Sequence, residues 1–314
     1  MRILVIGAGA VGGYFGGRLA QAGRDVTFLV RGRQADTIRK QGLQIISPYG
    51  DATLHPATLL ANELSGAFDL ILLSVKGYGL EPAMDDLAPA VGYGTMILPV
   101  LNGMRHIDLL IKRFGEDGVI GGACLVSSEV DKDGRIVQLT GTQRLVYGEL
   151  RGGLSERMNH LDAAMQGAGF EARISPDITQ EMWQKWIQLS SLGALTCLMR
   201  GTVGETEAVP GGADTAKQIL RESTSIATAC GHPPREDFLS KARSTLTTRG
   251  SNLTSSMYRD LVKGARVEAD QIIGDLLDRG HRLGVETPLL QAAYVNLKIY
   301  EGRLSTPKPS SLYL

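Results

Sequence analysis

The sequence predicts an α/β protein with an N-terminal Rossmann-type doubly wound sheet and an all-helical C-terminal domain. In the first half, short apolar runs rich in β-branched residues recur, with helix-like segments between the earlier ones. Alternation of this kind favours a parallel sheet covered by helices. Past about Asp177 the strand-like runs vanish and long amphipathic stretches take over, which indicates helices alone.

The length of 314 residues exceeds what one hydrophobic core usually organises, so two domains are expected. The change from strand-like runs to amphipathic stretches predicts a Rossmann domain at 1–176 and a helical domain at 177–314. The helical domain is expected to carry the substrate-binding and catalytic groups. The last ten residues, STPKPSSLYL, are expected to form a loosely held tail.

A βαβ unit opens the chain. Residues 2–6 (RILVI) are predicted to be a strand, the stretch from Val11 to Gly23 a helix, and Asp25–Val30 the next strand. Residues 136–149 indicate a hairpin-like pair of strands that closes the first domain. Three further predicted strands are Asp69–Val75, Thr95–Leu101 and Val119–Val126. Predicted helices of the second half include Asp214–Cys230 and Ala265–Gly284.

Composition restricts the kind of partner. Thirty-three basic residues balance thirty-three acidic ones, which argues against nucleic acid or an anionic membrane surface and favours a small-molecule ligand. No apolar stretch reaches the roughly 18 residues of a membrane span. The three cysteines form no CxxC pair and the five histidines no HxH or HExxH spacing, so neither disulfides nor a metal site is expected. A cytoplasmic location follows from the cysteine pattern.

Three glycines, Gly7, Gly9 and Gly12, form the pattern GAGAVG between the first strand and the first helix. In this context the first glycine permits a tight turn, the second lets a pyrophosphate approach the backbone, and the third lets helix and strand pack closely. Amide groups at the helix start then bind the phosphates. Glycines placed for packing alone do not account for all three positions, so dinucleotide binding is predicted.

The residue after the second strand selects the dinucleotide. An NAD-binding protein carries an acid there to bind the ribose hydroxyls, whereas this chain has Arg31, followed by Gly32 and Arg33. A guanidinium matches a 2′-phosphate, which an acid would repel. The alternative is a solvated loop arginine. NADP(H) is therefore the expected cofactor.

Lys185 lies between the only two tryptophans of the chain, in the stretch MWQKWIQLSSLG. At helical spacing it shares a face with Met182, Leu189 and Leu192, which are unusual neighbours for a solvated ammonium. One interpretation is a snorkelling lysine, whose methylenes cover apolar surface while the ammonium stays in water. The other is a functional lysine in a partly dry site.

Four segments give the chain a family resemblance: SVKGY (74–78), LNGM (101–104), WQKW (183–186) and TSSMYRDLVKGARVEAD (254–270). Together with the glycine loop they resemble the ketopantoate reductase (2-dehydropantoate 2-reductase) family over nearly the whole chain. The resemblance implies an N-terminal Rossmann domain that holds NADPH and a helical domain that completes the cleft. It also implies hydride transfer to the carbonyl of a 2-oxo acid, and a place in pantothenate biosynthesis.

The resemblance also implies roles for single residues. Lys185 matches the catalytic lysine, which protonates the carbonyl oxygen as hydride arrives at carbon; an ammonium suits this role because it stabilises a developing alkoxide. Glu268 matches the acid that contacts the substrate near the reacting centre, and Ser256 a serine that binds the substrate carboxylate. Asn102 and Lys76 match loop positions beside the nicotinamide and the mouth of the active site.

Each of these residues also has a structural interpretation. Glu268 would be a surface acid of an amphipathic helix, Ser256 a helix N-cap, Lys76 an exposed loop lysine, and Asn102 part of a turn. His106 lies near the Asn102 loop, and its role is left open. The joint occurrence of these residue types in the expected order favours the functional interpretation.

The chain departs from the family at two positions. The family places asparagines one and two helical turns after the lysine, where this chain has Leu189 and Gly193. A hydroxyl-bearing substrate would leave polar groups unpaired against a leucine, at roughly 1 to 3 kcal/mol each. Ser190 and Ser191 face elsewhere on the helix. The reduction of a 2-oxo acid is therefore better supported than ketopantoate as the substrate.

Two other functions are kept as alternatives. A 3-hydroxyacid dehydrogenase relative would also use a helix lysine, but Arg31 and the pair Ser256 and Glu268 argue against it. A non-catalytic NADPH sensor would need neither Lys185 nor Glu268. The preferred acid and the oligomeric state stay open, with a homodimer as one option.

Overall fold

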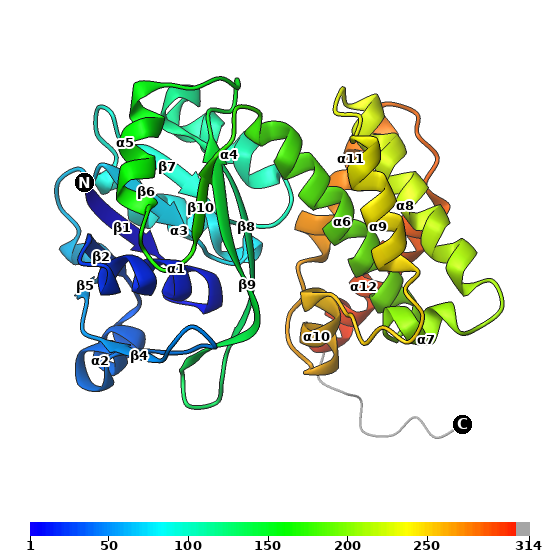
Figure 1. Cartoon of the computed structure of the whole chain (residues 1–314), viewed down its shortest axis with the longest axis horizontal. Coiled ribbons are helices and arrows are strands. Elements are labelled where there is room, and N and C mark those ends of the chain that lie inside the picture. The colour runs from blue at the N-terminus through cyan, green and yellow to red at the C-terminus, as the bar shows by residue number, and fades with distance from the viewer. Residues whose placement is uncertain (306–314) are drawn as a thin grey trace. The chain divides into compact units, whose positions relative to one another are not determined.

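The computed structural model describes residues 1–305 (Figure 1). Contacts divide it into two compact units, one of Met1–Leu101 with His106–Met182, the other of Asn102–Arg105 with the chain from Trp183 onward. The domain boundary expected at residue 176 stays a prediction. All but the first residue of the tail expected at 305–314 lies outside the described residues.

The first sheet of the N-terminal unit is parallel, with the strand order β5-β2-β1-β6-β7. Its strands are β1 (Arg2–Ile6), β2 (Asp25–Leu29), β5 (Ala57–Leu59), β6 (Leu70–Leu73) and β7 (Met96–Pro99). Every residue of β6 and β7 is buried, which is typical of parallel strands covered on both faces. The doubly wound sheet predicted from the sequence is confirmed.

The second sheet has the order β10-β9-β3-β4, with β8 antiparallel to β9. Its strands are β3 (Leu43–Ile46), β4 (Ala52–Leu54), β8 (Gly121–Val130), β9 (Ile136–Gly148) and β10 (Glu171–Ile174). The hairpin-like pair predicted at 136–149 is wrong, because this segment is one continuous strand that pairs with β8. The run predicted at 119–126 also differs from the expected parallel strand: Val119 forms an isolated bridge to Ile97, and residues 121–126 belong to β8.

Helix α1 lies between the two sheets of this unit (Figure 1). A Cβ atom on Gly16 would lie 2.8 Å from atoms of Phe28 and Val5 in the first sheet, and one on Gly17 would lie 2.7 Å from Ile45 in the second. The glycines therefore let the helix backbone approach both sheets closely. The helices are α1 (Ala10–Gln21), α2 (Gly32–Gln41), α3 (Leu80–Leu87), α4 (Arg105–Phe114) and α5 (Glu156–Met165), with short 3-10 turns at Ala61–Glu63, Gly77–Gly79, Ala88–Ala90 and Glu116–Gly118.

All the regular secondary structure among the described residues of the C-terminal unit is helical, as predicted. Its elements are α6 (Ile178–Met199), α7 (Val203–Glu207), α8 (Gly212–Ala229), α9 (Glu236–Leu246), α10 (Ser256–Val262), a π-helical turn (Asp270–Gly274), α11 (Asp275–Arg282) and α12 (Pro288–Ser305). The N-terminus of α12 is capped by the buried carboxylate of Glu222 on α8, which accepts hydrogen bonds from the amides of Leu289 and Leu290. Within residues 1–305, no helix has the length and apolar character needed to cross a membrane.

Candidate functional site

The glycine loop joins β1 to α1. Gly7 has a φ of +93°, which favours glycine, and Gly9 is the N-cap residue of α1. The Ser74 hydroxyl, directly after β6, donates to the carbonyl oxygens of Ile6 at 3.0 Å and Gly7 at 2.9 Å. The neighbouring strand therefore holds the loop in shape. Ser74 was not among the predicted site residues, although it belongs to the SVKGY segment.

The space around these glycines differs. A Cβ atom on Gly12 would overlap both the Ser74 hydroxyl and the Gly7 carbonyl oxygen, so this position is closed by packing. A Cβ atom on Gly9 would meet nothing within 4 Å. The first turn of α1 contains no acidic side chain. An open backbone at a helix start without negative charge suits a phosphate group.

Arg31 lies two residues after the end of β2 and is the N-cap residue of α2. Its side chain and that of Arg33 are exposed, and neither forms an ion pair within the described part of the chain. Lys76, also exposed, follows β6. Because β2, β1 and β6 are parallel neighbours, their carboxyl ends meet at one edge of the sheet. The structure thus brings Arg31, the glycine loop and Lys76 to the same edge.

The helical unit holds the other group of predicted residues. Lys185 on α6 is half-buried, and the two tryptophans that flank it in the sequence, Trp183 and Trp186, have exposed fractions of 3% and 1%. Glu268 has an exposed fraction of 4% and directly precedes a helical segment, where its carbonyl oxygen accepts the Ile272 amide at 3.1 Å. Its interpretation as a surface acid of a helix is therefore wrong, because the helix starts after it and packing covers it.

Two contacts tie the segments of Lys185, Glu268 and Asn102 together. The Trp186 indole nitrogen donates to the Ile272 carbonyl oxygen at 2.8 Å, which joins α6 to the π-helical turn after Glu268. Gly103 has a φ of +81°, and a Cβ atom there would overlap the Gln271 carbonyl oxygen. The interpretation of Asn102 as part of a turn stays a prediction: residues 102–104 form a bend, and Gly103 lies against the π-helical turn that follows Glu268. His106 is buried in α4, with an exposed fraction of 3%.

The π-helical turn is also anchored to α12. Asp270 accepts hydrogen bonds from the Tyr294 hydroxyl at 2.8 Å and from Lys298 at 3.0 Å. Although burial opposes ionisation, these two donors hold the pKa of Asp270 below its ordinary value. The turn therefore carries a stable negative charge fixed to α12 at neutral pH.

Ser256 is not the N-cap of α10, contrary to its structural interpretation. The N-cap is Ser255, whose hydroxyl accepts the Tyr258 amide at 3.0 Å and lies 2.9 Å from the Thr196 hydroxyl of α6. Ser256 is the first residue of the helix and half-buried, and its hydroxyl has no hydrogen bond within residues 1–305.

The two serines that follow Leu189 contact α8 and do not add polar groups beside Lys185. Ser190 and Ser191 are fully buried and contact the Ser223 hydroxyl of α8 at 3.3 and 3.1 Å. Leu189 itself is half-buried. Gly193 lies against Met257 of α10, so a methionine methyl fills the space beside it. The lysine-bearing helix therefore presents less polarity than the family pattern, as the sequence predicted.

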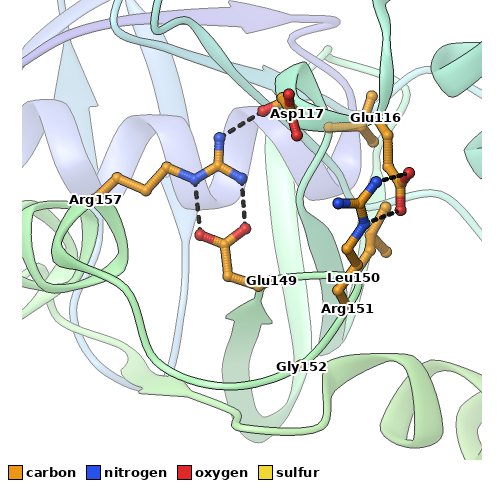
Figure 2. Close-up of a pocket in the computed structure, with 8 residues that line it drawn as sticks. Glu116, Asp117, Glu149, Leu150, Arg151, Gly152 and Arg157 are labelled. Carbon is orange, nitrogen blue, oxygen red and sulfur yellow. Dashed lines mark hydrogen bonds and ion pairs between the residues drawn. The ribbon is translucent and has the colours of Figure 1, made fainter.

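A pocket elsewhere in the N-terminal unit has a different character (Figure 2). Arg157 binds both carboxylate oxygens of Glu149, and Arg151 binds both of Glu116, with Nε to Oε1 distances of 2.7 Å in each pair. Arg157 also donates to the Asp117 carbonyl oxygen. Because carboxylates occupy both guanidinium groups, this pocket offers no unmatched positive charge to a 2-oxo acid or a phosphate.

Both units of the chain match models of one protein family. Residues 3–152 match the family described as Ketopantoate reductase PanE/ApbA, and residues 177–301 match Ketopantoate reductase PanE/ApbA C terminal. The chain is 35% identical to the uncharacterized oxidoreductase YkpB of Bacillus subtilis, covering 96% of this chain and 99% of that protein. It is 30% identical to the 2-dehydropantoate 2-reductase of Mesorhizobium japonicum, covering 93% and 95% of the two chains.

A solved structure shows the same fold. The 2-dehydropantoate 2-reductase of Methylococcus capsulatus is 30% identical and superposes with a TM-score of 0.85, covering 98% of this chain and 99% of the other. The glycine loop falls inside the first matched range of the family models, and Lys185, Ser256 and Glu268 fall inside the second. The chain belongs to the ketopantoate reductase family and is a pyridine-nucleotide-dependent oxidoreductase.

Proposed function

We propose that this protein reduces a 2-oxo acid to the 2-hydroxy acid with NADPH, and that Lys185 is the general acid. The observation that carries the proposal is the arrangement in the helical unit, where a half-buried lysine and a buried glutamate lie on segments joined by the Trp186 to Ile272 hydrogen bond. A partly dry ammonium and carboxylate pair is typical of proton-transfer sites.

The N-terminal unit fits the cofactor. The open space at Gly9 and the α1 amides would hold the pyrophosphate, and Arg31 would bind the 2′-phosphate. Lys76 and Asn102 would lie beside the nicotinamide half and the mouth of the site. The bound cofactor supplies a hydride to the carbonyl carbon of the substrate.

The remaining steps belong to this chain. The Ser256 hydroxyl and α10 would bind the substrate carboxylate, and Glu268 would contact the substrate near the reacting centre. As hydride adds to carbon and the carbonyl π bond breaks, the Lys185 ammonium donates its proton to the oxygen, which leaves the 2-hydroxy acid and a neutral amine. Solvent returns the proton to the amine. Stabilisation of the alkoxide and proton donation come from the same group.

Residues of α6 and α10 support a proposal about the substrate class. Leu189, the Met257-filled space beside Gly193, and the serines turned toward α8 favour a 2-oxo acid with a less polar side chain than ketopantoate. A cytoplasmic location remains part of the proposal, as does a role in pantothenate biosynthesis if ketopantoate is accepted.

The direct test is NADPH oxidation, followed by absorbance, across a panel of 2-oxo acids that includes ketopantoate. We expect turnover with at least one of them. Turnover of 3-hydroxy acids in the oxidative direction alone would favour the dehydrogenase alternative, and tight NADPH binding with no turnover on either panel would favour the sensor.

A further inference from the structure

We infer that Trp186 is a positioning residue, whose indole N–H fixes the π-helical turn after Glu268 and thereby sets the placement of Glu268 relative to Lys185. The inference rests on the proposed function, because it concerns how the two groups of that site are held.

The π-helical turn is the unusual element. It covers Asp270–Gly274, and the Asp275 amide reaches back five residues to the Asp270 carbonyl oxygen. Such turns contain one residue more than an α-helical turn, are rare, and are frequent at functional sites. The extra residue rotates the chain before the turn, where Glu268 lies, with respect to α11 after it.

The turn is held from three sides. Trp186 of α6 donates to Ile272, Gly103 of the Asn102 loop lies against Gln271, and Tyr294 of α12 bonds Asp270. Of these three contacts, the first alone comes from the helix that carries Lys185. Since Trp186 directly follows Lys185, one hydrogen bond links the backbone of the lysine to the segment of the glutamate.

The indole N–H has a specific partner rather than a general packing role. The bond length is 2.8 Å, and the exposed fractions of Trp186 and Ile272 are 1% and 3%. A buried carbonyl that loses its donor finds no water to replace it, so the turn would shift to satisfy the oxygen. A shift of about 1 Å in a catalytic group can lower turnover on the order of 100-fold.

Trp183 provides a matched control. It flanks Lys185 on the other side and is also buried, but its ring stacks on His232 at a centroid distance of 4.9 Å. Arg279 lies over both rings, 5.9 Å from the centroid of Trp183 and 5.5 Å from that of Trp186. The two tryptophans therefore share neighbours and differ in the hydrogen bond to the π-helical turn.

The experiment compares Trp186→Phe, Trp183→Phe and a full-length chain with β-(3-benzothienyl)alanine at 186, which keeps the shape of the indole but cannot donate. Each is measured for kcat and KM with the best 2-oxo acid, NADPH affinity and amide hydrogen exchange over residues 268–276. Both changes at 186 should lower kcat roughly 10- to 100-fold and speed exchange in that segment. NADPH affinity should not change, and Trp183→Phe should keep its kcat.

Near-normal kcat and unchanged exchange in the benzothienyl variant would overturn the inference, even if Trp186→Phe fails to fold. Equal losses of kcat in Trp183→Phe and Trp186→Phe would also overturn it, because they would indicate general aromatic packing. The proposed function fails separately, when the unmodified protein turns over no 2-oxo acid; the exchange measurement still reports on the turn in that case.

Discussion

A Cβ atom on Gly193 would lie 2.8 Å from Cε of Met257, so the methionine occupies the space that a longer side chain on α6 would need. The contact joins the lysine-bearing helix to α10, whose first residue is Ser256. An apolar methyl group therefore fills the volume beside Gly193, and this supports the proposal of a substrate with a less polar side chain.

The first prediction concerns substrate preference. The unmodified protein should reduce an apolar 2-oxo acid at least as well as ketopantoate, judged by kcat/KM. Leu189→Asn should raise the ratio of ketopantoate to apolar acid by roughly 5- to 150-fold, the equivalent of 1 to 3 kcal/mol for one satisfied polar group. Gln188→Asn, one residue earlier on the same helix, serves as the control. A panel in which ketopantoate wins by orders of magnitude without any substitution would contradict the prediction.

The second prediction concerns Arg31 and the cofactor. A charged hydrogen bond to the 2′-phosphate, worth roughly 1.5 to 3 kcal/mol, corresponds to a 10- to 150-fold preference for NADPH over NADH. Arg31→Ala should remove most of this preference by weakening NADPH alone. Arg39→Ala is the matched control, because Arg39 lies on the same helix and bonds Thr58. Fluorescence titration of both cofactors measures the preference. Equal affinities for NADPH and NADH in the unmodified protein would show that Arg31 does not select the cofactor.

The third prediction separates two glycines of one loop. Gly12→Ala should lower the free energy of unfolding by roughly 1 to 3 kcal/mol, because its methyl group would overlap Ser74 and the Gly7 backbone. Gly9→Ala should leave stability nearly unchanged, since nothing lies within 4 Å, yet weaken NADPH about tenfold or more by filling the phosphate space. Thermal unfolding and NADPH titration measure both. Intact NADPH affinity in a stable Gly9→Ala protein would rule out phosphate binding at this position.

The fourth prediction decides between the two interpretations of Lys185. As the proton donor, Lys185→Ala should lower kcat roughly 10²- to 10⁴-fold while NADPH affinity survives, because the glycine loop and Arg31, which we propose hold the cofactor phosphates, lie in the other unit. If Lys185 is instead a snorkelling lysine, Lys185→Ala should lower the free energy of unfolding by about 0.5 kcal/mol at most and leave turnover unchanged. Lys217→Ala, which removes an exposed lysine paired with Asp214 on α8, is the control. Loss of both turnover and NADPH binding would indicate misfolding instead.

The fifth prediction concerns acid stability through the pocket of Figure 2. The hydrogen bonds from Arg157 hold the pKa of the Glu149 carboxyl below its ordinary value of 4.5 in the folded chain. In the unfolded chain the carboxyl regains that value and binds a proton more readily. The Glu149 to Arg157 pair therefore makes its full contribution to the free energy of unfolding above about pH 4.5. This contribution is lost as the pH falls through the lower native pKa of Glu149.

Glu149→Gln should therefore show a shallower loss of thermal stability between neutral and acid pH than the unmodified protein, although it is less stable at neutral pH. Glu236→Gln, at an exposed acid of α9, should keep the original slope. Identical slopes for all three proteins would show that this ion pair does not govern the acid transition.

Local patterns predicted much of the fold. The strand, glycine loop and helix at the N-terminus follow one another within a few residues, so their spacing alone indicates a dinucleotide site. The pairing of β8 with β9 was not predictable in this way. Residues 136–149 contain a Thr and Gly pair, Thr140 and Gly141, typical of a turn, but β8 pairs along both halves of the segment and keeps it one strand.

The sequence by itself determined which chemical groups the chain carries and in what order: a glycine loop after a strand, Arg31 in place of an acid, and Lys185 on an apolar helix face. The tertiary structure alone decided that Glu268 is buried, that Ser255 rather than Ser256 caps α10, and that Trp186 bonds Ile272. Helical and strand periodicity depend on neighbouring residues, whereas burial and hydrogen-bond partners depend on segments far apart in the chain. Trp186 and Ile272 are 86 residues apart, and their contact exists because α6 and the π-helical turn pack together.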